Sequence, residues 1–151
     1  MIIIMLGAPG TGKGTVAGIL QDKLKIKQIS TGDIFRQNIK EESEIGLIAK
    51  KYIEQGALVP DEFTNKIVEN RINQSDVKNG MILDGYPRNV KQAEKLEEML
   101  KKQDRKIDKV ILLTTPEDEI VERVSNRLVC PNCKSVFNTK LNPPKKERNL
   151  W

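Results

Sequence analysis

The 151-residue chain has no histidine, only two cysteines and few aromatic residues, which make up 4% of it. The absence of histidine counts against general acid–base catalysis, because imidazole is the side chain that most often does this work near neutral pH. With so few aromatics, a hydrophobic core must consist mainly of Ile, Leu and Val.

Long hydrophobic runs are also missing. The run "MIIIML" at the start of the chain is far shorter than a membrane span or a signal-peptide core, and no basic stretch precedes it. Two cysteines and no secretion signal predict a reducing, cytoplasmic setting without a membrane partner.

The two cysteines form a single "CPNC" motif, Cys130 and Cys133. Such spacing usually supplies half of a tetrahedral zinc site or a redox pair. The remaining sequence offers neither another cysteine nor a histidine. From the residues alone, a metal site, a redox pair and a chance spacing all stay open.

What the chain does contain is ordinary for one globular domain: 38% apolar and 31% charged residues. The net charge of +5 favours an anionic partner. Basic residues are spread along the chain with acidic residues between them, and the densest cluster, "PPKKER", is short. The simplest interpretation of this cluster is a solvated loop. Nucleic acid is one candidate partner, and a small phosphorylated ligand explains the charge equally well.

Short β-branched runs alternate with helical periodicity, which indicates an α/β fold with a parallel sheet. Strands are expected within the segments 1–6, 27–30, 80–85 and 109–115. Between Thr31 and Val59 no run resembles a strand, so an all-helical insertion is expected there. A further helix is expected from Pro116 through Arg127, followed from about Leu128 by a loop-rich appendage.

The strongest motif is "GAPGTGKGT", from Gly7 to Thr15. It matches G-x-x-x-x-G-K between a buried strand and a helix, so its backbone N–H groups and Lys13 are expected to hold a nucleoside triphosphate. Gly14 stands where a hydroxyl residue usually follows the lysine, and Thr15 comes one later. Mg²⁺ is therefore expected to be held mainly by phosphates and water.

Asp84 ends the strand "MILD" and is placed like the acidic residue of a Walker B strand. The alternative is a simple turn former, because Gly85 follows it. The position at the end of a strand that points toward the phosphate loop favours the functional role.

The motifs "GAPGTGKGT", "STGDIFR", "LDGYPRNVKQ" and "NRLVCPNC…NPPK" occur in order and together resemble the bacterial-type, zinc-lid adenylate kinases, from Met1 to about Lys145. The resemblance implies a P-loop NTPase-type parallel sheet flanked by helices, with a helical AMP-binding insertion and a partial lid. The implied domains are a core (1–29 and 60–127), an AMP-binding lobe (30–59) and a partial lid (128–151). The implied activity is reversible, Mg²⁺-dependent phosphoryl transfer from ATP to AMP, giving two ADP.

The resemblance also implies roles for individual residues. The residues implied to bind AMP are Thr31, Arg36, Ala57, Leu58, Val59, Gly85, Tyr86, Pro87, Arg88 and Gln92. Those implied to bind ATP are Gly10, Thr11, Gly12, Lys13, Gly14, Thr15, Arg123, Arg127, Val136 and Phe137. The implied catalytic residues are Lys13, Asp84, Arg88, Arg123 and Arg127.

Two metal sites follow from the same resemblance. Asp33 and Asp84 would hold Mg²⁺ through water, and Cys130 with Cys133 would be the first half of a structural zinc ribbon in the lid. Because "ERNLW" offers no further thiolate, the two cysteines are expected to be free thiols or a weak two-ligand site. Family members continue beyond the lid, so a shortened form with weak or absent turnover is expected.

Three other functions compete with adenylate kinase. A UMP or CMP kinase is the nearest, although Thr31 together with Gln92 favours adenine. A non-catalytic nucleotide-binding fragment is the second. A zinc-ribbon nucleic-acid binder ranks low, because it needs two complete C-x-x-C motifs. The expected partners are ATP, AMP and ADP, and the expected state is a monomer.

Overall fold

The computed structural model describes residues 1–130 and 136–144. The chain forms two compact units, one containing residues 1–6 and 13–112 and the other residues 7–12 and the described residues from 113 onward. Within the described ranges, no helix is long and apolar enough to cross a membrane.

The first unit is built on a four-stranded sheet in the order β2-β3-β1-β4. Its strands are β1 (Ile2–Leu6), β2 (Lys27–Ser30), β3 (Met81–Asp84) and β4 (Lys109–Leu112). All three pairings are parallel, as expected when each strand is followed by a helical crossover. The four predicted strands and the α/β fold are therefore confirmed.

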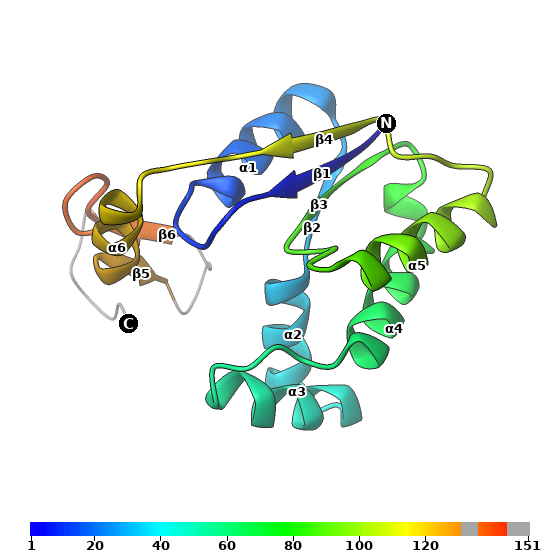
Figure 1. The fold of residues 1–151 in the computed structure, drawn as a ribbon, viewed down its shortest axis with the longest axis horizontal. Coiled ribbons are helices and arrows are strands. Elements are labelled where there is room, and N and C mark those ends of the chain that lie inside the picture. Colours follow the sequence, from blue (N-terminus) through cyan, green and yellow to red (C-terminus); the bar gives the residue numbers. More distant parts are fainter. Residues whose placement is uncertain (131–135, 145–151) are drawn as a thin grey trace. The chain divides into compact units, whose positions relative to one another are not determined.

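Helices cover both faces of this sheet (Figure 1). They are α1 (Lys13–Leu24), α4 (Asp61–Ile72) and α5 (Val90–Lys101), with a short 3₁₀ helix at Ser75–Val77. Ile2 and Ile4 on β1 pack in one core cluster with Val68 of α4 and Leu96 of α5. Alternation along the strand directs Ile3 and Met5, which are also buried, to the opposite face.

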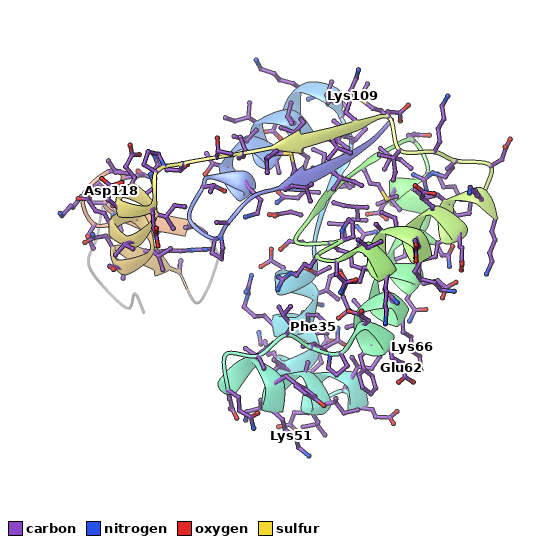
Figure 2. The ribbon with its side chains drawn as sticks, viewed as in Figure 1. Phe35, Lys51, Glu62, Lys66, Lys109 and Asp118 are labelled. Carbon is purple, nitrogen blue, oxygen red and sulfur yellow. The ribbon has the colours of Figure 1, made fainter. Side chains whose placement is uncertain are left out.

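The helical lobe, residues 31–59, contains α2 (Thr31–Lys40) and α3 (Glu44–Glu54). Serine caps both helices: the Ser30 hydroxyl accepts from Asp33 N and the Ser43 hydroxyl accepts from Gly46 N. Phe35 of α2 packs with Ala49, Val59 and Ile67 in a small core of its own. Figure 2 shows Phe35 on α2, whereas Lys51 extends outward from α3. The predicted all-helical insertion is confirmed.

The second unit contains α6 (Glu117–Ser125) and an antiparallel pair, β5 (Arg127–Val129) with β6 (Val136–Asn138). The prediction that the helix continues through Arg127 is wrong, because α6 ends at Ser125. Asn126 terminates it: its side chain donates to Glu122 O, and its own carbonyl accepts from Thr139 N. The expected helix is thus two residues too long, and strand pairing from Arg127 onward replaces part of the expected loop-rich appendage.

Replacing Gly46 with alanine is expected to destabilise the helical lobe by about 1–3 kcal/mol, as overpacking does. A Cβ on Gly46 would overlap the backbone carbonyl of Asn38 at the end of α2. The matched control is Gly18→Ala in α1, where a Cβ meets nothing within 4 Å, and which should gain about 0.5–1 kcal/mol. Chemical denaturation of both variants measures this difference, and equal effects would contradict the assigned packing.

Candidate functional site

The site lies at the edge of the sheet where the parallel strands end. In the register, Asp84 at the end of β3 lies beside Ser30 of β2 and Met5 of β1. The segments that follow these strands therefore start at one edge. In open α/β sheets this carboxyl edge is where ligands bind.

Lys13 and Asp84 come together at this edge. Lys13 is the first residue of α1, and a Cβ built on Gly14 would stand 3.9 Å from Asp84 Oδ2. Gln28 Nε2 donates to the same carboxylate oxygen at 3.3 Å. A helix N-terminus with a lysine is a ready anion site, so the predicted phosphate-binding lysine and the Walker B-like aspartate are neighbours.

Burial raises the pKa of Asp84 above its usual value, and the nearby charge of Asp33 adds to this, whereas Lys13, Gln28 and Arg88 oppose it. Desolvation is the largest of these effects, so a charged Asp84 lacks part of the stabilisation it would have in water. A bound cation would supply the stabilisation that the charged carboxylate lacks.

The preceding part of the phosphate loop, residues 7–12, belongs to the second unit. Gly10 and Gly12 adopt φ angles of +88° and +90°, which curl the backbone as the motif predicts. The Thr11 hydroxyl donates to Ala8 O at 2.8 Å and is nearly buried. The side chain of Thr11 is therefore used in a hydrogen bond within the loop itself.

A hydrogen bond connects α2 to the turn after β3. The hydroxyl of Thr31, at the start of α2, donates to Gly85 O at 3.0 Å. Gly85 has a φ of +81°, and a Cβ there would come within 2.9 Å of Thr31 Oγ1. Only glycine combines this left-handed backbone with so close an approach.

Beside this hydrogen bond lies a cavity of about 280 Å³, near the lower end of the roughly 300–1,000 Å³ typical of small-molecule sites. Eight of the twelve residues that line it are among those expected to bind AMP. The lining residues are Thr31, Gly32, Phe35, Arg36, Ile53, Ala57, Leu58, Val59, Thr64, Gly85, Arg88 and Gln92.

Two arginines contribute guanidinium groups to this cavity. Arg36 makes an exposed ion pair with Asp33, with 2.6 Å between Nη2 and Oδ1. Arg88 follows β3 and donates from Nε to Gly85 O at 2.9 Å. Both side chains are largely exposed, and a pair of forked cationic donors is well suited to a phosphate group.

Gln92 is one of three buried polar residues that line the cavity, with Thr31 and Thr64, and 2% of its surface is exposed. Its Oε1 accepts from Arg88 N at 2.8 Å, and its Nε2 donates to Asp61 Oδ1 at 2.6 Å. Both the oxygen and the nitrogen of the side-chain amide are therefore hydrogen-bonded.

Several other predicted site residues lie elsewhere. Tyr86 is fully buried in the main core, with its hydroxyl 2.7 Å from Asn65 Oδ1, and neither it nor Pro87 lines the cavity.

In the second unit, Arg123 and Arg127 lie on different elements, because the helix expected to continue through Arg127 ends at Ser125. Arg123 lies on α6 and pairs with Glu119 at 2.9 Å, whereas Arg127 lies on β5 opposite Asn138. Val136 and Phe137 lie on β6.

The metal predictions have different outcomes. Cys130 is a free, partly buried thiol, and Cys133 lies outside the described residues. The described part of the chain contains no cluster of three or more His, Cys, Asp or Glu side chains able to hold a metal ion. Asp84 and Asp33 nevertheless fit Mg²⁺, because this ion commonly takes one or two carboxylates and completes its shell with water and phosphate.

Four cavity residues were missed by reasoning from the sequence: Gly32, Phe35, Ile53 and Thr64. Ile53 is an apolar position of an amphipathic helix, and Phe35 stands within the motif "STGDIFR" without an implied role of its own. Asp61 was not among the predicted site residues, although its carboxylate contacts Gln92. No sequence pattern marks a contact between residues 31 positions apart.

Comparison with known proteins gives one consistent result. The family model described as "Adenylate kinase" matches residues 5–149. An adenylate kinase of Caldicellulosiruptor saccharolyticus is 50% identical over 147 residues, which cover 97% of this chain and 68% of that protein. Adenylate kinases of Streptomyces avermitilis and Clostridium botulinum are also each 50% identical, covering 97% of this chain and 67% and 68% of those proteins.

Asp84→Asn is expected to stabilise the nucleotide-free protein at pH 7. Because its folded-state pKa is raised, Asp84 contributes stability that is present below pH 3.8 and lost as the pH rises through that pKa. The gain from asparagine should therefore shrink on acidification, when the wild-type carboxyl also becomes neutral.

Asp76→Asn is the control of opposite sign. Arg71 holds Asp76 in a two-pronged pair of 2.8 Å bonds and lowers its pKa. Asp76 therefore contributes stability above pH 3.8 that is lost as the pH falls through its folded-state pKa. Thermal unfolding of both variants from pH 3 to 7 measures the two trends. Equal and pH-independent shifts would contradict the assignment.

Proposed function

Since the chain belongs to the adenylate kinase family and is a nucleoside monophosphate kinase, a phosphotransferase, we propose that the cavity of the helical lobe is its AMP site. ATP places its phosphates on the glycine-rich loop and Lys13, and reversible transfer of the γ-phosphoryl group gives two ADP. The predicted division into core, AMP-binding lobe and partial lid is part of the same proposal.

The observation that carries this proposal is the composition of the cavity. Gln92 offers a buried amide that can pair with a base edge, while Arg36 and Arg88 offer guanidinium groups to a phosphate. Phe35 and Val59 are buried apolar residues at the same cavity, suited to contact a base ring. A nucleoside monophosphate combines these three requirements in one molecule.

The chemistry needs no general base. The acceptor is a phosphate oxygen that is already ionised at neutral pH, so the barrier is lowered mainly by alignment and by cations that offset crowded negative charge. Lys13 and Arg88 supply such charge. Arg123 and Arg127 are proposed as further phosphate ligands, and Val136 with Phe137 as contacts of the ATP base.

Adenylate kinases use Mg²⁺, and Asp84 with Asp33 would hold it through water. When bound, the ion would neutralise part of the charge on the ATP phosphates. Asp33 also pairs with Arg36. The cation and the arginine therefore compete for the Asp33 carboxylate when ligands bind.

Three further properties belong to the proposal. Cys130 and Cys133 are two of the four ligands that a structural zinc needs, so we expect the pair alone to bind zinc weakly. A cytoplasmic location follows from the sparse cysteine content, and a monomer is the expected state.

Isothermal titration with AMP, CMP and UMP tests the substrate class. AMP is expected to bind most tightly, because Gln92 is placed to read an adenine edge. A coupled assay of ADP formation from ATP and AMP then tests turnover. Tighter binding of CMP or UMP would favour the pyrimidine kinases, and AMP binding without turnover would leave a nucleotide-binding module.

Arg88→Ala is expected to weaken AMP binding by roughly tenfold or more, since a charge-assisted hydrogen bond contributes about 1.5–3 kcal/mol. The matched control is Lys91→Ala, which removes an equal, exposed charge on α5 and lies outside the cavity lining. Calorimetric titration of both variants with AMP measures the difference. An equal loss in both would indicate general electrostatic attraction instead of a phosphate contact.

A further inference from the structure

We propose that Asp61 is a positioning residue that fixes the orientation of the Gln92 amide and so makes the site select a 6-amino purine over a 6-oxo purine. The inference rests on the proposed function, because it concerns the base bound in the same cavity. It assigns a role to a side chain that does not line that cavity.

The geometry consists of a short chain of hydrogen bonds. Asp61 is the first residue of α4, and its Oδ1 accepts from Gln92 Nε2 at 2.6 Å. Both of its oxygens also lie 3.1 Å from Asn89 Nδ2. Asn89 in turn caps α5 by accepting from Gln92 N at 2.8 Å. The carboxylate is thus held against the first turn of α5, directly at the glutamine.

The two partners of Gln92 permit only one orientation of its amide. An ionised carboxylate can only accept hydrogen bonds, so it requires the NH₂ group. At the other end the backbone N–H of Arg88, which can only donate, requires the carbonyl oxygen. A flipped amide would set oxygen against carboxylate and N–H against N–H. Gln92 is buried, so little water is available to relieve these contacts.

This orientation leaves one N–H donor and one lone pair on Oε1 for a ligand. The adenine edge presents a complementary pair, an acceptor at N1 and a donor at the 6-amino group. Hypoxanthine presents the reverse, a donor at N1 and an acceptor at O6, and would require the flipped amide. Site groups left unpaired by the wrong base are a strong source of selectivity.

Asp61→Asn tests the inference, because asparagine keeps the size of the side chain and can either donate or accept. AMP and inosine monophosphate, which differ in the 6-substituent, are titrated by calorimetry into the wild-type chain and the variant. The wild-type protein should prefer AMP. In Asp61→Asn the ratio of the two affinities should fall by about tenfold, the scale of one good bidentate base contact.

Glu62→Gln is the matched control, since it removes the same charge from the next residue of α4, where the side chain is exposed. It should keep the wild-type ratio. Asp61→Glu restores an acceptor-only group and should recover part of the preference for AMP. Thermal unfolding of each variant separates binding effects from folding.

The outcomes are distinguishable. Wild-type protein that does not bind AMP would overturn the proposed function, and the inference with it. A wild-type preference that persists unchanged in Asp61→Asn would overturn the inference alone. Equal weakening of both nucleotides in that variant would assign Asp61 a purely structural role and would also overturn it.

Discussion

The parallel register of β1, β2 and β3 is the constraint on which the rest of the first unit depends. It sets Asp84 beside Ser30 and Met5, so the segments that follow these strands begin at one edge of the sheet. Thr31 can then reach Gly85 O, and Gly14 can lie beside Asp84. A one-residue slip of β3 would turn Asp84 to the opposite face of the sheet and move Gly85 away from Thr31. Ile82 and Leu83 are both fully buried, so such a slip would also require both faces of the strand to repack.

On this rigid edge, the polar groups differ in how firmly they are held. Gln92 is buried and engaged at both ends of its amide, which suits the reading of a base. The Arg36–Asp33 pair is about two-thirds exposed on both sides, and such pairs contribute only about 0–1 kcal/mol. A phosphate can therefore replace Asp33 as the partner of Arg36 at little cost. The proposed site thus combines a firmly held polar group with a loosely held one that can change partners.

Local patterns predicted much of this from the sequence. The buried run before Gly7, the spacing up to Lys13 and the apolar run within residues 109–115 are all encoded within a few neighbouring residues, and the corresponding strands and helix are present. Prediction failed where contacts with segments distant in the sequence determine the structure. Arg127 continues the helical period of α6 but pairs with Asn138 in a strand. Tyr86 stands within a motif yet fills the core, and Asp61 acts on a residue from another helix. Periodicity carries no information on which distant segment will be a partner.

Two features of the edge reduce stability in the absence of a ligand. Asp84 is partly desolvated, so its ionised form is disfavoured even though Lys13 is close. Gly85 has the left-handed backbone and missing side chain that the approach of Thr31 requires, at the cost of greater freedom in the unfolded chain. Neither feature improves the packing of the core. The cost at Asp84 is explained if the edge has to receive phosphates and a cation, because a ligand can return the electrostatic stabilisation that burial removed. The glycine at position 85 is explained by its hydrogen bond with Thr31. Functional sites often carry such local costs, and here they occur on consecutive residues, the last residue of β3 and the one that follows it.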